Sequence, residues 1–134
     1  MIVQVEISRV IISEFNQHQV IYLKEKDGPR EFPVVIGIFE ATTIDRRLRK
    51  IPSARPMTHD LFRDMVKALG GTIRDMVIYR AEGQTFYAHL RIQKGEELIL
   101  LDSRPSDAIA ITLGEDPPLN IYVQEEVLQQ VAQS

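Results

Sequence analysis

Two short segments of the sequence contain the residue types that phosphate chemistry uses, RPMTHD at residues 55–60 and RPSD at residues 104–107. Each segment runs directly into an apolar helical pattern, so each would form a helix entrance. Free backbone N–H groups and the helix dipole favour anions there, and a guanidinium adds a forked pair of donors. We therefore predict Arg55, Arg104 and Ser106 as phosphate ligands. In the structural alternative, each arginine simply pairs with a nearby aspartate, Asp60 or Asp107.

His59 is the candidate general base of these segments. It would occupy the first turn of a helix, outside the apolar stripe that begins at Leu61. The positive end of a helix dipole disfavours a protonated imidazole, which suits a base, whereas Asp60 has the opposite effect. We predict His59, Asp60 and Asp107 as catalytic residues; an exposed histidine without a role is the alternative. The remaining histidines have no spacing typical of zinc ligands.

Four carboxylates could place a hard divalent cation, namely Glu40, Asp60, Asp102 and Asp107. Phosphodiester hydrolysis commonly uses such groups to hold Mg²⁺ or Mn²⁺, which polarises phosphoryl oxygens and activates water. Glu40 and Asp102 are the predicted metal ligands. Carboxylates at helix starts also occur for capping alone, which is the competing explanation.

The composition limits the classes of protein that the chain can belong to. Its 134 residues are 44% hydrophobic and 26% charged, which fits one domain over residues 1–134. The absence of cysteine excludes disulfides and thiolate chemistry. A net charge of -3 provides no overall attraction to nucleic acid, so any polyanion site must be local. The sequence has no long apolar run or signal-peptide pattern, and we expect a cytoplasmic protein without membrane association.

The hydrophobic periodicity predicts two similar units of strands followed by helices. An α+β fold results, a single compact domain with a probable internal duplication of a β3α2 unit at about residues 1–70 and 71–134. The strands would share one curved or barrel-like, mainly antiparallel sheet, although two unrelated meanders could give the same pattern. We predict strands at 1–12, 20–26, 31–36, 72–80, 85–93, 96–101 and 120–123, a loop at 14–18, and helices at 41–51, 58–69, 105–113 and about 127–131.

Two of the predicted helices have unusual surfaces. The first contains a basic patch, Arg46 to Lys50, which could hold a phosphate backbone or could be an ordinary solvated face. No aromatic residue interrupts this patch, so base stacking is not indicated. The helix at 105–113 is apolar nearly all round, and we expect it to be deeply buried or covered by another subunit.

Several segments together resemble the bifunctional nuclease domain family: PVVIGIFEATTI, RPMTHDL, QTFYAHLRI, DSRPSDAIAI and IYVQEEVL, in the same order over essentially the whole chain. The resemblance implies a compact α+β fold on a duplicated unit, a dimer, and a DNase and RNase activity associated mainly with plant members. The chain departs from the family pattern in its basic first helix, and it lacks an additional segment that plant members carry.

These observations lead to one principal hypothesis and two rivals. In the first, the protein is a nuclease that hydrolyses phosphodiester bonds of DNA and RNA with help from Mg²⁺ or Mn²⁺. In the second, it is a non-catalytic dimeric module that binds a phosphorylated ligand. In the third, it is an RNA-binding regulator that uses the Arg46 to Lys50 patch. Nucleic acid and a second copy of the chain are the expected partners.

Overall fold

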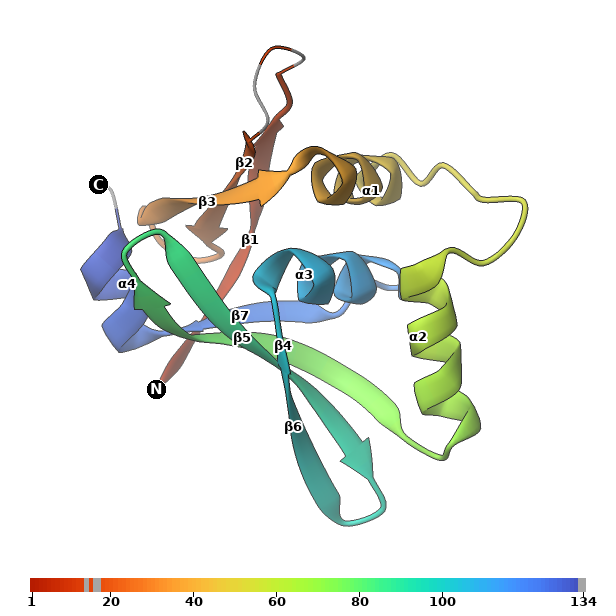
Figure 1. Ribbon diagram of the computed structural model, residues 1–134. Coiled ribbons are helices and arrows are strands. Elements are labelled where there is room, and N and C mark those ends of the chain that lie inside the picture. The colour runs from red at the N-terminus through yellow and green to blue at the C-terminus, as the bar shows by residue number, and fades with distance from the viewer. Residues whose placement is uncertain (14, 16–17, 133–134) are drawn as a thin grey trace.

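The computed structural model describes residues 1–13, 15 and 18–132 and divides that part of the chain into seven strands and four helices. Three strands and two helices come first, then three strands, a helix, a short strand and a last helix (Figure 1). The elements are β1 (Ile2–Ile11), β2 (His18–Glu25), β3 (Glu31–Gly37), α1 (Ile38–Leu48), α2 (Thr58–Ala68), β4 (Thr72–Glu82), β5 (Thr85–Lys94), β6 (Glu97–Ser103), α3 (Pro105–Leu113), β7 (Asn120–Gln124) and α4 (Glu125–Val131).

All seven strands form one open sheet in the order β3-β2-β1-β7-β4-β5-β6. Two antiparallel meanders, β1-β2-β3 and β4-β5-β6, lie on either side of β7. The short β7 joins them, because it pairs antiparallel with β1 and parallel with β4. The last strands of the two meanders, β3 and β6, therefore become the sheet edges, and α1 and α3 follow directly from them.

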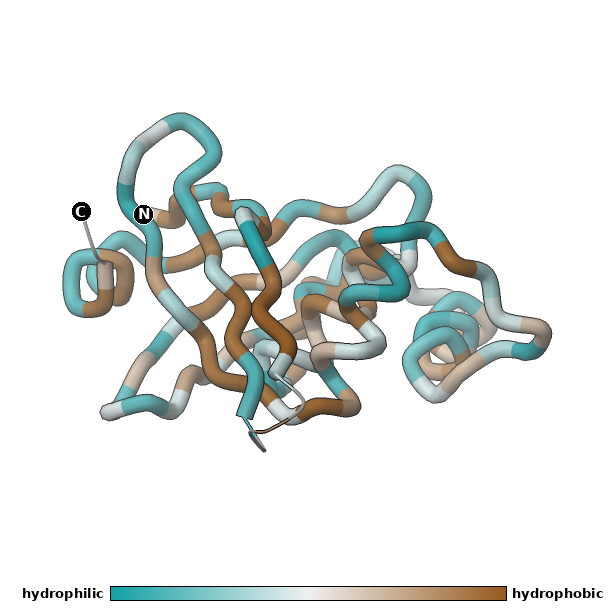
Figure 2. Tube along the Cα trace, turned by 90° about the horizontal axis from the view of Figure 1, so that it is seen from above, coloured by the Kyte–Doolittle hydropathy of each residue, from teal (hydrophilic) through white to brown (hydrophobic). Residues whose placement is uncertain are grey.

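The helix α3 is the centre of the hydrophobic core. It packs against α1, α2, β4, β5 and β7, and Figure 1 shows it between α1 and the sheet. Seven of its nine residues are buried, from Pro105 to Thr112 with the exception of Asp107. Figure 2 shows hydrophobic residues along the strands and in the interior, with hydrophilic residues along the loops at the periphery. The prediction that residues 105–113 are deeply buried is confirmed.

The α+β class, the seven strands, the four helices and the mainly antiparallel sheet agree with the prediction. The sheet is not a closed barrel, because β3 and β6 are both edge strands. Common descent of the two halves stays a prediction, although each half is a meander followed by a helix. The predicted loop at 14–18 falls mostly outside the described residues. None of the described helices is long and apolar enough to cross a membrane.

The entrance to α2 is capped from within the helix. Met57 is the N-cap residue, with an extended backbone and no capping bond from its own side chain. The Asp60 carboxylate takes over this task, since Asp60 Oδ2 accepts a hydrogen bond from the Met57 backbone N–H at 2.9 Å. The entrance is thus stabilised from its third helical residue.

Candidate functional site

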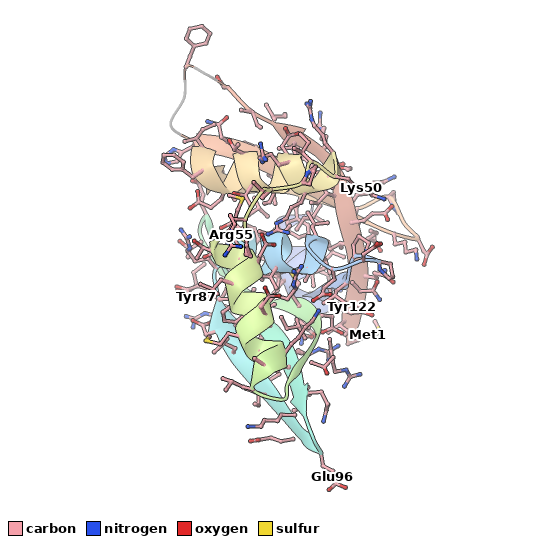
Figure 3. The ribbon with its side chains drawn as sticks, turned by 90° about the vertical axis from the view of Figure 1, so that its right-hand side faces the viewer. Met1, Lys50, Arg55, Tyr87, Glu96 and Tyr122 are labelled. Carbon is pink, nitrogen blue, oxygen red and sulfur yellow. The ribbon has the colours of Figure 1, made fainter. Side chains whose placement is uncertain are left out.

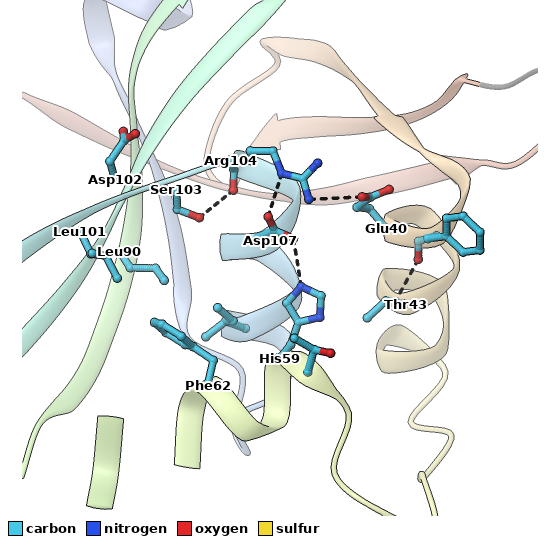
Figure 4. Close-up of a pocket in the computed structure, with 13 residues that line it drawn as sticks. Glu40, Thr43, His59, Phe62, Leu90, Leu101, Asp102, Ser103, Arg104 and Asp107 are labelled. Atoms are coloured by element: carbon cyan, nitrogen blue, oxygen red, sulfur yellow. Dashed lines mark hydrogen bonds and ion pairs between the residues drawn. The ribbon is translucent and has the colours of Figure 1, made fainter. Parts of the chain in front are cut away.

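A cleft of about 520 Å³ lies where α1, α2, α3 and the β5-β6 edge of the sheet meet. Its polar lining includes Glu40, His59, Asp102, Arg104 and Asp107, and its apolar lining comes from three helices and two strands (Figure 4). These five polar side chains come from segments up to 67 positions apart in the sequence, yet the fold places them around one space. Five of the eight predicted site residues therefore meet in a single cleft.

Four of these side chains form one continuous network. Asp107 accepts hydrogen bonds at both carboxylate oxygens, from His59 Nε2 at 3.0 Å and from Arg104 Nε at 2.8 Å. Arg104 Nη2 donates to Glu40 Oε1 at 3.3 Å. Figure 4 shows the resulting chain from α2 through α3 to α1. The network therefore joins all three helices at the wall of the cleft.

Asp107 is the hub of this network and is held in its ionised form. Burial raises the pKa of the Asp107 carboxyl, but the hydrogen bonds from Arg104 and His59 and their positive charges outweigh burial, so the pKa lies below its ordinary value. A carboxylate can only accept hydrogen bonds, so Nε2 of His59 carries the hydrogen. The lone pair of a neutral His59 ring is then on Nδ1, as a general base requires.

Asp102 lies apart from this network. Its Oδ1 accepts a hydrogen bond from the Tyr79 hydroxyl at 2.9 Å, which raises the pKa of Tyr79. Tyr79 in turn stacks on His89 with ring centroids 3.9 Å apart. Figure 4 places Asp102 on the strand side of the cleft and Glu40 on the α1 side, with Arg104 between them. Asp102 pairs with His89, on the face of the sheet opposite the cleft residues Leu90 and Leu101. Its carboxylate therefore points toward Tyr79 and away from the cleft, whereas Glu40 lies beside Arg104.

The predicted catalytic Asp60 is turned away from the cleft. Its Oδ1 accepts a hydrogen bond from Arg47 Nη2 at 2.7 Å, and its Oδ2 caps α2 through Met57. Burial raises the pKa of Asp60. The hydrogen bonds from Arg47 and the Met57 N–H and the nearby positive charges lower it by more, so the pKa of Asp60 lies below its ordinary value. The alternative in which Asp60 pairs with Arg55 does not hold, because Arg47 of the first helix is its partner.

The remaining two predicted phosphate ligands also lie outside the cleft. Arg55 is exposed at the N-terminal end of α2 (Figure 3) and makes no hydrogen bond or ion pair within the described part of the chain. Ser106 is 6% exposed and lines a different pocket beside the N-terminus of α3. The two entrances therefore do not place both arginines in one pocket. The alternative pairing of Arg104 with Asp107 is confirmed at 2.8 Å.

Metal binding depends on how many ligands converge. Among residues 1–13, 15 and 18–132, no group of three or more His, Asp or Glu side chains is arranged to hold an ion. Mg²⁺ often binds proteins through only one or two carboxylates and completes its shell with water and phosphate oxygens. Glu40 and Asp102 fit that sparse pattern only, and metal binding by them stays a prediction.

Sequence reasoning missed Tyr79, which holds Asp102, and Arg47, which holds Asp60. The Tyr79 contact follows from strand register, since β5 pairs His89 with Asp102 while β4 places Tyr79 beside that pair. A correctly paired meander could have revealed it. No sequence signal connects Arg47 with Asp60, because the two residues come from different helices.

The basic patch Arg46 to Lys50 is partly neutralised within the fold. Arg47 is 14% exposed and bonded to Asp60, and Arg49 pairs with Asp45 at 3.1 Å. Two of the four basic side chains of the patch therefore already form ion pairs with carboxylates. This arrangement weakens the prediction that the patch is a dedicated RNA-binding surface.

The model of the bifunctional nuclease domain matches residues 21–134, which is most of the chain. The chain belongs to the bifunctional nuclease domain family. Every polar residue of the cleft, from Glu40 to Asp107, lies within the matched region. The resemblance predicted from the sequence motifs is confirmed.

Bacterial and plant proteins are among the relatives that match this chain. An uncharacterized protein of Mycobacterium tuberculosis is 35% identical over 127 residues, which cover 95% of this chain and 74% of the relative. Bifunctional nuclease 1 of Oryza sativa is 29% identical over 108 residues, or 78% of this chain, and bifunctional nuclease 1 of Arabidopsis thaliana is 24% identical over 114 residues, or 82%. The chain spans only 33% and 35% of the length of these two plant proteins.

Proposed function

We propose that the protein is a nuclease that hydrolyses phosphodiester bonds of DNA and RNA. The observation that carries the proposal is the hydrogen-bonded series His59–Asp107–Arg104 at the wall of an open cleft. A histidine base that is oriented by a carboxylate and lies near an arginine guanidinium is suited to activating water beside a phosphate. The family and the names of the plant relatives support the same reaction class.

Each residue of the series has a distinct role in this proposal. His59 Nδ1 takes the proton of the attacking water, while Asp107 positions the ring and balances the positive charge that develops on it. Arg104 Nη1, which has no partner among the described residues, donates to a non-bridging phosphate oxygen. Thus His59 and Arg104 would contact substrate, and Asp107 acts through them.

We further propose that Glu40 and Asp102 hold a Mg²⁺ or Mn²⁺ ion when substrate is bound. Glu40 and Asp107 set two carboxylates against Arg104 in the cleft, and the Asp102 carboxylate would turn from Tyr79 to join them, so a phosphate would enter an acidic space. A divalent cation would offset that repulsion and polarise the phosphoryl oxygen. Loss of cleavage on chelation, with recovery on adding Mn²⁺, is the expected result.

Purified protein tests the nuclease proposal directly with labelled single- and double-stranded DNA and RNA. We expect cleavage by the native chain and a loss of about 100-fold or more in His59→Ala, since general bases contribute that much. Asp64→Ala is the matched control, because Asp64 lies on the same helix, is 52% exposed and does not line the cleft. Equal cleavage by the native chain and His59→Ala at trace level would identify a contaminant and reject the proposal.

One observation favours a second candidate, a binding module without catalysis. Both acidic partners of Arg104 lie on helices, so the same network could serve to fasten α1, α2 and α3 together. Under this alternative, His59→Ala leaves any cleavage unchanged and Arg104→Ala lowers the melting temperature strongly. The nuclease proposal expects the opposite order of effects, with Arg104→Ala folded and inactive.

We also propose that the protein forms a homodimer through the outer face of α2. Leu61, Met65 and Leu69 are spaced by four residues along this face and are 65%, 52% and 67% exposed. Such a continuous apolar stripe on a surface helix marks an interaction site. Light scattering should give a dimer for the native chain and a monomer for Met65→Glu. A native monomer at micromolar concentration would contradict the proposal.

A further inference from the structure

A second pocket of about 350 Å³ shares Arg104 with the cleft. It is lined by β3, by the hairpin between β4 and β5, and by the N-terminus of α3. Arg104 is the charged residue that lines both spaces. The two pockets are therefore neighbours at the start of α3.

The electrostatic character of the second pocket differs from that of the cleft. Among the described residues, its lining includes no aspartate or glutamate, whereas Glu40, Asp102 and Asp107 all line the cleft. Besides Arg104, its polar groups are the side chains of His18, Gln84, Thr85 and Ser106. Every one of these side chains can donate a hydrogen bond. The pocket thus offers hydrogen-bond donors, whereas the carboxylates of Asp107 and Glu40, which pair with Arg104, line the cleft and not this pocket.

Ser106 provides an independent indication of a ligand. Its residue surface is 6% exposed, it lines this pocket, and its hydroxyl makes no hydrogen bond within the part of the chain that the structure describes. In the described part of the chain, the buried side-chain atoms without a partner belong to Arg47 and Arg63, so the Ser106 oxygen reaches the surface of the pocket. A ligand oxygen in the pocket would satisfy the Ser106 hydroxyl.

The backbone at the start of α3 also favours binding of an anion. Arg104 is the N-cap and makes no capping bond with its side chain, and Pro105 at the first helical position has no N–H. The N–H groups of Ser106 and Asp107 precede the first internal bond of the helix, which Ala108 N–H donates to the Arg104 carbonyl oxygen. Two backbone donors and one hydroxyl are consequently available at the positive end of a nine-residue helix.

We propose that Arg104, Ser106 and the first turn of α3 form a second phosphate subsite, which binds the phosphate adjacent to the one attacked in the cleft. A tetrahedral phosphate can accept from a hydroxyl, backbone N–H groups and a guanidinium simultaneously. The assignment of this phosphate to a nucleic-acid strand rests on the proposed nuclease function. Binding of a phosphate group in the pocket does not.

The binding test uses inorganic phosphate and the whole chain. In ¹⁵N-correlated NMR spectra, phosphate should shift the amide signals of Ser106 and Asp107 in a saturable manner. Ser106→Ala should weaken this binding about tenfold, the usual loss for a hydrogen bond to a charged group. Ser53→Ala is the matched control, because Ser53 is an exposed loop residue outside this pocket. If Ser106→Ala does not fold, Ser106→Cys replaces it with nearly the same volume.

Two outcomes would overturn the subsite. One is the absence of a saturable shift up to about 10 mM phosphate, an affinity weaker than that of a functional site. The other is an equal affinity in Ser106→Ala, which would mean that phosphate binds elsewhere. His59→Ala separates this proposal from the nuclease proposal, because it should bind phosphate normally while cleavage is lost. In cleavage assays, Ser106→Ala should raise KM about tenfold and leave kcat within about twofold.

Discussion

Replacing Asp60 by alanine should destabilise the fold without removing a catalytic group. The native carboxylate is only 18% exposed and accepts two hydrogen bonds, from Arg47 Nη2 at 2.7 Å and from the Met57 N–H at 2.9 Å. Arg63 Nη1 lies further away, at 4.0 Å from Oδ1. Arg47 is 14% exposed, and its Nε is already buried without a hydrogen-bond partner. In Asp60→Ala, the Arg47 guanidinium would therefore lose its counter-charge in a place where water reaches it poorly.

The size of the effect follows from these two contacts. A charge-assisted hydrogen bond in a partly buried site contributes about 1.5–3 kcal/mol, and loss of a helix cap costs about 1 kcal/mol. Because the contacts share one side chain, we expect a combined decrease of about 2–4 kcal/mol in the free energy of unfolding. For a chain of this length, that decrease lowers the melting temperature by about 7–14 °C.

Thermal unfolding followed by circular dichroism measures this change, with Asp64→Ala as control. Asp64 lies on the same helix but is 52% exposed and pairs only with Arg63 at 3.4 Å, so its loss should cost less than about 0.5 kcal/mol. Asp60→Ala should retain cleavage per folded molecule. A variant with native stability and no cleavage would refute the structural role and restore the catalytic one that the sequence predicted.

Three further predictions concern charge and packing around the site. Arg55→Ala should leave the melting temperature and KM of cleavage unchanged within about twofold, because Arg55 is exposed and unpaired; a tenfold rise in KM would contradict this. The pKa values of Asp60 and Asp107 are lowered in the fold, so their contribution to stability is complete above the ordinary value of 3.8 and is lost as the pH falls below it. Melting temperatures measured from pH 7 to pH 2.5 should fall steeply below about pH 4, and less steeply in Asp60→Ala. Gly114→Ala should also destabilise the protein, because a Cβ atom there would meet Nη1 of Arg47; its effect should be less than additive with Asp60→Ala, as denaturant titration of the double variant would reveal.

The sequence by itself determined the local structure of this protein. Periodicity of apolar residues depends on contacts within one element, so it predicted all seven strands and four helices, with α3 at its observed bounds of Pro105–Leu113. The nearly all-round apolar surface of α3 likewise predicted its burial. The local pair of Arg104 and Asp107, three residues apart in a helix entrance, could be foreseen from spacing alone.

Only the tertiary structure decided which distant groups meet. Insertion of β7 between the two meanders sets the strand order, and that order places α1, α2 and α3 against one another. Consequently Asp60 of α2 pairs with Arg47 of α1, and His59 of α2 bonds to Asp107 of α3. Ser106 lines a separate pocket. Ion pairs and hydrogen bonds of this kind act over about 3 Å in space, whatever the separation in sequence. Residue type and spacing could therefore identify candidate site residues. The packing of the helices decided which of these candidates lie together in the cleft.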